Sequence, residues 1–313
     1  MRKLSQMFTA ILCLTILRPP HIESEKCSIV LNSTTQICEA ECIDKSNQSA
    51  SLNFDYFELF ISTPCTLNKL TIKHKTYTDV ISSLNTSLTT SLSNLILNFN
   101  QIETIQRGSF TCLTSLTSLS LCENAIDVIE AGSFGTLTQL TFLFLGSNKI
   151  KKISAATFLG LASLKELWVQ LNELRNTSIA GLHNLTNLIL YSNQMGKVLA
   201  NTFADLDQLS NLDLASSEIV SIESDSFSNL RNLKSLVLLS NKLTRIVNGM
   251  FDHLQSLINL YLNANEIVVI EAGSFRHLVN LKLLYIFSNN LKSISSQTFD
   301  PSLGIIINII LIF

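Results

Sequence analysis

The chain has 313 residues, a net charge of −2 and 46% hydrophobic residues, with acidic and basic side chains interspersed. This balance excludes the strongly basic surface of a nucleic-acid-binding protein and the charge blocks of a disordered tail. The hydrophobic residues recur at regular intervals, and no run reaches the length that a membrane span requires. We therefore expect neither a nucleic-acid partner nor a membrane span within this chain.

Residues 1–24 have the pattern of a cleaved signal peptide. Arg2 and Lys3 precede an apolar stretch from Met7 to Leu17, and Ser24 offers a small residue near the expected cleavage point. A spanning helix needs about 20 apolar residues, so the stretch is too short to be an uncleaved anchor. We expect a secreted or extracellular protein. Five Asn-x-Ser/Thr sequons fit that route, at Asn32, Asn47, Asn85, Asn176 and Asn184.

Residues 25–66 contain no repeat and hold four cysteines: Cys27, Cys38, Cys42 and Cys65. The first coil of a solenoid has no neighbour to cover its apolar edge, so we expect this segment to be an N-terminal cap. A zinc site is the alternative, but no Cys-x-x-Cys pair or nearby histidine supports it. Export implies an oxidising compartment, and four cysteines allow three disulfide pairings there.

One phrase is repeated from residue 67 to residue 299. A clear copy begins at Leu116 and continues with Leu119, Leu121, Asn124 and Ile126, and the next begins 24 residues later at Leu140. A fixed period of this size indicates a stack of coils. A degenerate opening copy begins at Leu67. Nine regular copies begin at Leu92, Leu116, Leu140, Leu164, Leu185, Leu209, Leu233, Leu257 and Leu281.

The copies open with the pattern LxxLxL, with Val169 and Ile286 in place of the last leucine in two of them, and this pattern predicts one short strand whose fourth and sixth positions face inward. Parallel stacking of the opening strand and the nine regular ones gives ten strands in one curved sheet. The ninth position is asparagine, whose amide both donates and accepts, so it satisfies buried backbone groups where the chain turns. We predict an asparagine ladder formed by Asn100, Asn124, Asn148, Asn172, Asn193, Asn241, Asn265 and Asn289, with Ser217 interrupting it.

A late phenylalanine recurs and predicts a second buried row beneath the convex side. The fourth copy lacks it, spans 21 residues instead of 24, and has Ile179 nearest the vacant place. A tolerated loop deletion is one interpretation, and a local bend that shapes a binding region is the other. The row consists of Phe110, Phe134, Phe158, Phe203, Phe227, Phe251, Phe275 and Phe299.

These motifs resemble the typical 24-residue subclass of extracellular leucine-rich repeat proteins, which includes Toll-like receptor ectodomains and variable lymphocyte receptors. The resemblance covers residues 67–299. It implies an α/β repeat solenoid, the leucine-rich repeat horseshoe, with a parallel β-sheet on the concave face and mostly irregular or short helical turns on the convex face. It also implies a disulfide-stapled cap with the interlaced pairs Cys27–Cys42 and Cys38–Cys65.

In such a fold, odd positions of each strand face outward on the concave side, where a ligand would bind. Exposed apolar patches usually mark contact sites, although strand propensity alone also enriches aromatic residues. We predict two aromatic contact regions, over repeats three to five and near the C-terminal end. Their residues are Phe142, Phe144, Trp168, Ile189, Tyr191, Tyr261, Tyr285 and Phe287.

Two further features carry weaker predictions. An extended strand separates Cys112 from Cys122, so a bond between them is disfavoured, and both are expected to be free unless Cys122 pairs between chains. His253 and His277 occupy equivalent convex positions, which fit solvated imidazoles better than a metal site. No catalytic motif stands out, so we expect no enzyme, cofactor or metal.

Residues 300–313 form an apolar tail without the cysteine-rich cap that the resemblance implies. Ile305 lies one period after Leu281, which suggests a partial tenth repeat, and truncation, a short form that pairs end to end, or a cut anchor are the alternatives. The resemblance implies a protein, microbial glycan or lipid ligand on the concave face. Innate immune recognition is the first expectation, and extracellular matrix or adhesion/guidance binding is the second.

Overall fold

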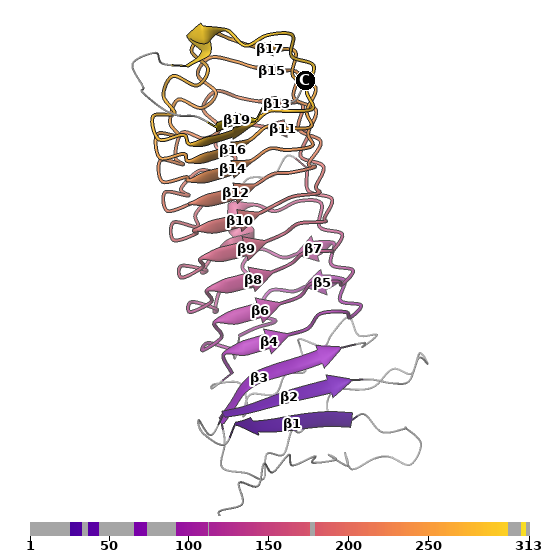
Figure 1. Ribbon diagram of the computed structural model, residues 1–313. Coiled ribbons are helices and arrows are strands. Elements are labelled where there is room, and N and C mark those ends of the chain that lie inside the picture. The colour runs from indigo at the N-terminus through magenta and orange to yellow at the C-terminus, as the bar shows by residue number, and fades with distance from the viewer. Residues whose placement is uncertain are drawn as a thin grey trace, which may run out of the picture.

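The computed structural model describes residues 26–32, 37–43, 66–73, 92–111, 113–175, 179–299 and 308–310. The chain stacks one coil upon another, and the strands rise like rungs from β1 to the C-terminal end (Figure 1). The predicted solenoid with a parallel sheet is therefore confirmed. Among the described residues, no helix is long and apolar enough to cross a bilayer.

One 13-stranded sheet runs the length of the stack. In every regular repeat the strand covers the third to fifth positions. The nine strands are β4 Asn94–Ile96, β6 Ser118–Ser120, β8 Phe142–Phe144, β9 Glu166–Trp168, β10 Asn187–Ile189, β12 Asn211–Asp213, β14 Ser235–Val237, β16 Asn259–Tyr261 and β18 Leu283–Tyr285.

Four further strands extend this sheet beyond the regular repeats. The opening strand β3, Thr66–Lys73, pairs in parallel with β4. Before it, β1, Lys26–Asn32, and β2, Ile37–Ile43, form an antiparallel pair. At the other end β19, Asn308–Ile310, pairs in parallel with β18 and places Asn308 opposite Leu283. The period from Leu281 to Ile305 would have placed Ile307 there, so the last strand lies one residue later than the repeat predicts.

The leucine pattern explains the strands. The central residue of each regular strand is buried, as at Leu95, Leu119 and Leu143, which are 0% exposed. Register partners are equivalent residues of neighbouring repeats, for example Leu119 with Leu143. Burying one such leucine contributes about 1.5–3 kcal/mol, and each contributes to a continuous core shared by adjacent coils.

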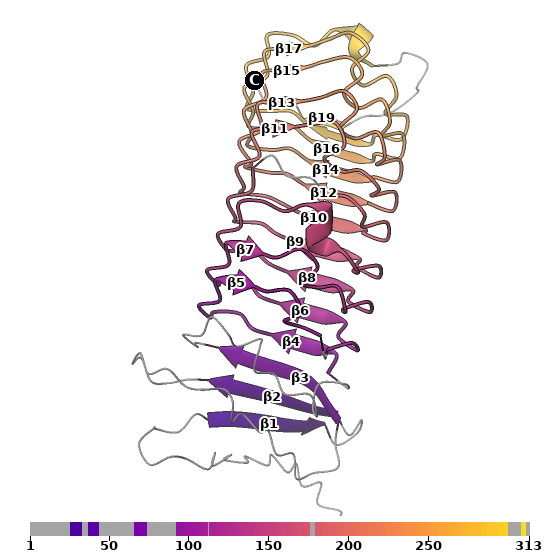
Figure 2. The same cartoon turned by 180° about the vertical axis from the view of Figure 1, so that it is seen from behind.

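The opposite side of each coil is mostly irregular, as expected, but it also carries short strands that the sequence did not predict (Figure 2). These form three parallel pairs: β5 Thr104–Ile105 with β7 Val128–Ile129, β11 Lys197–Val198 with β13 Ser221–Ile222, and β15 Arg245–Ile246 with β17 Val269–Ile270. The described helical turns are η2, Ala155–Phe158, and η3, Ser296–Thr298.

The asparagine at the ninth position connects each coil to the coil before it. Asn148 Nδ2 donates to the carbonyl oxygens of Leu121 at 3.0 Å and Leu145 at 2.9 Å, and its Oδ1 accepts from Ile126 N at 3.0 Å. Asn172 and Asn265 repeat this arrangement. The amide oxygen thereby satisfies a buried backbone N–H that would otherwise be unpaired, and the amide nitrogen adds a donor to carbonyl groups of two successive coils.

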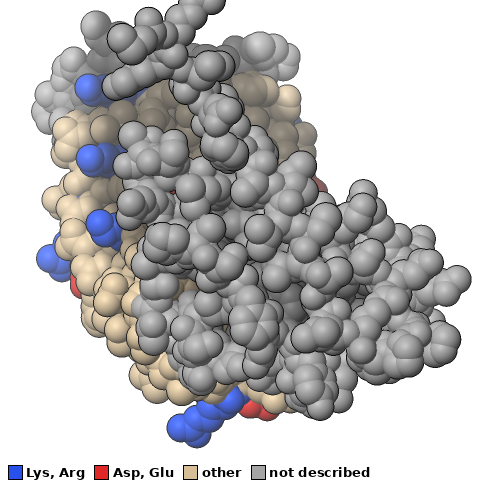
Figure 3. Space-filling view, turned by 90° about the horizontal axis from the view of Figure 1, so that it is seen from below, with Lys and Arg blue, Asp and Glu red and all other residues tan. Residues whose placement is uncertain are grey.

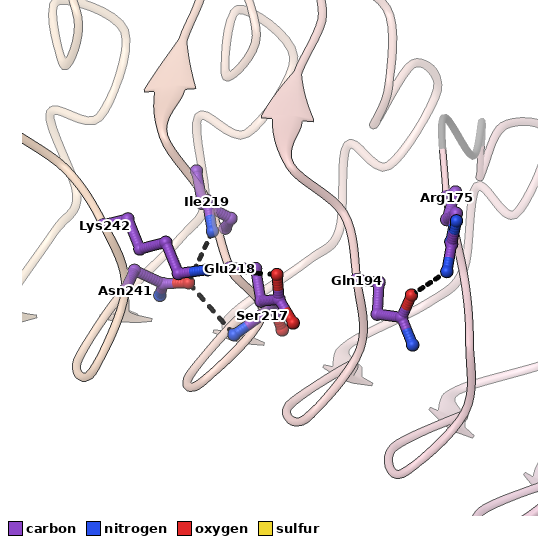
Figure 4. Close-up of polar contacts among 7 residues, drawn as sticks. All are labelled: Arg175, Gln194, Ser217, Glu218, Ile219, Asn241 and Lys242. Atoms are coloured by element: carbon purple, nitrogen blue, oxygen red, sulfur yellow. Dashed lines mark hydrogen bonds and ion pairs between the residues drawn. The ribbon is translucent and has the colours of Figure 1, made fainter.

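Repeat six shows how the ladder tolerates serine. Ser217 is fully buried, and its hydroxyl lies 3.1 Å from the carbonyl oxygen of Leu190. Because serine is shorter than asparagine, Met195 N donates instead to the Ser217 carbonyl oxygen at 3.0 Å. Asn241 Oδ1 accepts from both Ser217 N and Ile219 N at 3.0 Å, which closes the gap (Figure 4).

The residue before each ladder position adopts a left-handed backbone conformation although none is glycine. Ser147 has φ 56° and Leu171 has φ 55°. This conformation is uncommon for L-residues and persists only where the surroundings determine it. Here the following asparagine holds the turn, because its Nδ2 donates to the carbonyl groups two and three residues before it, as at Asn148 and Asn172. The side chain of the left-handed residue projects outward, and Phe99 and Leu171 are exposed at this position.

The phenylalanine row forms a second seam of the core. Phe110 stacks on Phe134, and stacked or tilted ring contacts run from Phe203 to Phe299 at centroid distances of 5.4–6.3 Å. In the short fourth repeat, Ile179 is 0% exposed. An aliphatic side chain therefore fills the core position of this repeat.

Candidate functional site

The outer surface of the long sheet, formed by positions three, five and seven of the nine repeats, is called the sheet face. It is the concave face of the sequence prediction. Register pairing aligns its fifth positions in one row across the strands. That row consists of Ile96, Ser120, Phe144, Trp168, Ile189, Asp213, Val237, Tyr261 and Tyr285.

Three aromatic residues on β8 and β9 form what we call the Trp168 cluster: Phe142, Phe144 and Trp168. The rings of Phe142 and Phe144 lie 6.5 Å apart and nearly parallel, and Phe144 meets Trp168 at 5.4 Å in a T-shaped arrangement. Phe142 is 37% exposed and Trp168 is 36% exposed. Edge-to-face and offset contacts are favourable ring geometries, so the cluster is an ordered apolar surface that remains in contact with water.

Ile189 and Tyr191 extend this cluster toward repeat six. Ile189 is the register partner of Trp168, and both Ile189 and Tyr191 are half-buried. Gln170 lies beside them, with its amide over Gly146, where a Cβ would come within 2.5 Å of Gln170 Nε2. Gly146 therefore makes room for Gln170, whose Oε1 is buried without a hydrogen-bond partner in the described structure. A ligand donor is one way to satisfy that oxygen.

A second group, the Tyr285 cluster, contains Tyr261, Tyr285 and Phe287. Tyr261 and Tyr285 stack at 5.2 Å, and Phe287 meets Tyr285 edge-on at 6.0 Å. All three are half-buried. Val237 and Asp213 separate this cluster from Ile189 in the fifth-position row, so the structure places the predicted ligand residues in two groups on one face.

Polar groups at the third position form a chain that the sequence reasoning missed. Asn211 Nδ2 donates to Asn187 Oδ1 at 2.6 Å, and Asn187 Nδ2 donates to Glu166 Oε1 at 3.2 Å. Glu166 is two residues before Trp168 on β9, so its carboxylate lies beside the Trp168 cluster on the same face. Their outward strand positions could have indicated that these polar residues lie on the sheet face. They were missed because only aromatic and apolar side chains were considered as ligand contacts.

Asp213 is the second carboxylate that the sequence reasoning missed. It lies in the fifth-position row between Ile189 and Val237, and its Oδ1 accepts from Ala215 N at 3.0 Å. Burial raises the pKa of the Asp213 carboxyl, while the hydrogen bond from Ala215 lowers that pKa by a smaller amount. A carboxylate half-removed from water with apolar lateral neighbours is a candidate contact for a ligand.

Cys122 also lies on the sheet face, where it is a half-buried free thiol. Burial raises the pKa of the Cys122 thiol, and the bond from the Gly146 backbone offsets that only in part. A raised pKa disfavours the thiolate, which is the reactive form. This chemistry fits a packing role better than nucleophilic catalysis.

On the convex side, Arg276 Nε donates to His277 Nε2 at 2.8 Å. Within the described ranges, no group of three or more His, Cys, Asp or Glu residues could hold a metal ion. Viewed from the N-terminal end, basic side chains are spaced singly along one visible side of the solenoid (Figure 3).

Several residues that carry predictions lie outside the described residues, namely the disulfide cysteine Cys65, the expected free thiol Cys112 and the sequons at Asn47, Asn85 and Asn176. The backbone register of β1 and β2 places Cys27 opposite Cys42, the arrangement that one predicted disulfide would need. Asn184 is exposed, and its amide donates to Ala162 O at 2.8 Å. The disulfides and glycosylation sites therefore remain predictions.

The leucine rich repeat family matches residues 90–150, 114–174, 207–267 and 255–302 of this chain. No curated protein matches it in sequence. Similar solved structures include the Drosophila Toll–Spatzle complex, described as a hub in development and innate immunity, with a TM-score of 0.65 and 22% identity. The match covers 72% of this chain but 31% of that one, so this chain spans about a third of its neighbour.

Two other solved structures are similar. A leucine-rich repeat protein of Leptospira interrogans has a TM-score of 0.58 and 24% identity, over 74% of this chain and 63% of that one. A complex of Latrophilin 3, Unc5D and the leucine-rich repeat part of FLRT2 has a TM-score of 0.51 and 24% identity, over 74% and 62% respectively. At these identities the likeness establishes the fold.

Proposed function

Because this chain belongs to the leucine-rich repeat family, we propose that it is a non-enzymatic extracellular module that binds a protein ligand on its sheet face. Repeat solenoids present long surfaces of this kind, and function resides in the exposed side chains rather than in the shared core. The signal-like residues 1–24 and the sequons support an extracellular location.

The observation that carries this proposal is the Trp168 cluster. It presents ordered aromatic rings to water at the third and fifth strand positions, which need not be aromatic for the fold: the equivalent residues of β6 are Ser118 and Ser120. Covering apolar surface contributes about 25 cal/mol per Å², and tryptophan is among the residues that dominate binding energy. Binding of a partner that covers the cluster is therefore favourable in free energy.

Catalysis has less support on this surface. A nucleophilic mechanism needs a thiolate or hydroxyl with an adjacent base, whereas the sheet face of the described repeats has one cysteine with a raised thiol pKa and no histidine. The two sheet-face carboxylates belong to separate strands, and Asn187 already occupies one of them. The carboxylates and aromatic rings of the sheet face are therefore better suited to binding a ligand than to catalysis.

We assign the module to innate immune recognition, and an extracellular matrix or adhesion protein is the second candidate. Aromatic side chains on the sheet face favour recognition of a folded partner. The similar folds of Toll, described with Spatzle, and of FLRT2, found in a complex with Latrophilin 3 and Unc5D, do not separate the two candidates. The class of partner retained in the experiment below decides between the two.

The test is a binding screen of the secreted chain against the secreted and cell-surface proteins of its own organism. A Phe142→Ala/Trp168→Ala variant removes the exposed rings. A Leu159→Ala/Val279→Ala variant removes comparable exposed apolar side chains elsewhere, since these two are 67% and 43% exposed. We expect a partner whose affinity falls at least about tenfold in the first variant and is unchanged in the second. Partners that bind both variants like the unmodified chain contradict the proposal.

A further inference from the structure

The charged groups of the sheet face are all of one sign. At positions three, five and seven of the nine described repeats, Glu166 and Asp213 are the charged residues, and neither lysine nor arginine occurs there. Basic residues are elsewhere on the coils, for example Lys149, Lys151 and Lys152 after β8. A partner that approaches the sheet directly therefore meets carboxylates and aromatic rings.

Glu166 is held in place for such a contact. The hydrogen-bond chain from Asn211 through Asn187 ends on Glu166 Oε1, so one carboxylate oxygen is oriented beside Trp168. The described residues form four ion pairs, and Glu166 belongs to none of them. A cation placed over an indole face is attracted by the negative face of the ring, and here it would also meet this carboxylate.

Asp213 provides the second contact. Its lateral neighbours Ile189 and Val237 are apolar, it is half-buried, and its carboxylate is also outside the four described ion pairs. Removing an unpaired carboxylate from water costs free energy, and a bound cation recovers part of that cost. The bond from Ala215 N fixes Oδ1, so the carboxylate is oriented before a ligand arrives.

We infer that the segment of the protein ligand that covers the Trp168 cluster is basic and places two lysine or arginine side chains on the sheet face. One lies on Trp168 beside Glu166, and the other pairs with Asp213. This inference rests on the proposed function, because it names the chemistry of the partner at the same site.

Register sets the spacing between the two cations. Trp168, Ile189 and Asp213 are consecutive register partners on β9, β10 and β12. Two strand spacings of about 4.8 Å separate the first from the third, which is about 10 Å. A polyproline II segment has three residues per turn and rises about 3.1 Å per residue, so residues i and i+3 lie on one side at about 9 Å.

Trp168 itself provides the measurement, because it is the single tryptophan of the chain. The probe is the capped peptide PPKPPKPP, whose lysines have this spacing, titrated against the full chain while Trp168 fluorescence is recorded. Peptides with glutamine or glutamate in place of both lysines are the comparisons. We expect a saturable change in Trp168 fluorescence with the lysine peptide. Either comparison peptide should bind at least about fivefold more weakly.

A Glu166→Gln/Asp213→Asn variant should bind the lysine peptide about fivefold or more weakly than the unmodified chain does. Its affinity for the glutamine peptide should be unchanged. The matched control is Asp127→Asn/Glu130→Gln, which removes the same charge from exposed positions outside the sheet face and should have no effect. No preference for the lysine peptide, or equal binding by both carboxylate variants, overturns the inference.

The proposed function can stand when this inference fails. A partner that needs Phe142 and Trp168 but binds the Glu166→Gln/Asp213→Asn variant normally would retain the binding module and reject the basic ligand. A screen in which no partner needs the Trp168 cluster rejects the module itself.

Discussion

The inside of the coils and the sheet face follow opposite rules. Inside, equivalent positions repeat almost unchanged: the ladder departs from asparagine once, at Ser217, and Ile179 fills the core of the short fourth repeat. On the sheet face, the fifth-position row changes from Ser120 to Phe144 and then to Trp168 within three strands. Stability is therefore shared among the coils, whereas recognition is local. Variants on the inside of the coils and on the sheet face should separate these two properties.

The largest expected effect is on the phenylalanine row. Phe251 is 1% exposed and stacks between Phe227 and Phe275 at 6.3 and 5.9 Å. Phe251→Ala should lower the free energy of unfolding by about 3–5 kcal/mol, because it removes buried surface and leaves a cavity. Urea unfolding, monitored by circular dichroism, measures this loss of stability. Phe142→Ala on the sheet face is the control and should cost less than about 1 kcal/mol, and equal losses in both would remove the distinction.

An intermediate effect is expected for the ladder. Asn148→Ala leaves the Ile126 N–H without its hydrogen-bond partner and removes one of the two side-chain donors to the Leu121 carbonyl, at a cost of about 1–3 kcal/mol. The exposed residue Asn290 follows a ladder position instead of occupying it, so Asn290→Ala should leave the melting temperature unchanged. A thermal melt of Asn148→Ala that matches the unmodified chain would contradict the ladder's role.

The smallest effect concerns Asp213, and its sign depends on pH. Burial raises the pKa of this carboxyl in the folded chain, so the folded state binds the proton more tightly than the unfolded state. The unmodified chain therefore loses stability as pH rises through the folded-state pKa. Asp213→Asn, which can still accept from Ala215 N, should be more stable at neutral pH. Its advantage should vanish below the ordinary value of 3.8, as urea unfolding at both pH values will show.

The repeat itself was predictable because its inward positions obey one constraint, the shared core. The pattern at Leu116, Leu119 and Leu121 fixed the strand and its register, and with them the direction of Trp168 and Tyr285. Side-chain contacts between strands were not predictable, because they depend on the neighbour rather than on the repeat. The bond from Asn187 to Glu166 and the placement of Gln170 over Gly146 are of this kind.

The ends of the array were harder to predict for a related reason. Beyond the regular repeats, the period no longer dictates pairing, and the last strand moves one residue from the expected register. The antiparallel pairing of β1 with β2 has no counterpart in the repeats, so no periodic argument could have supplied it. The short strands of the convex side were missed because two residues carry no distinguishable pattern.

The bonds of the asparagine ladder reach only the preceding coil, and this has a consequence for how such a chain can change length. Asn148 bonds within its own turn and with repeat two, and Asn172 does the same with repeat three. A recombination event that duplicates or deletes 24 residues between equivalent positions would leave every surviving amide with a partner of the same kind. Genetic shuffling of whole units can therefore rearrange the order of surface residues while the interior stays intact.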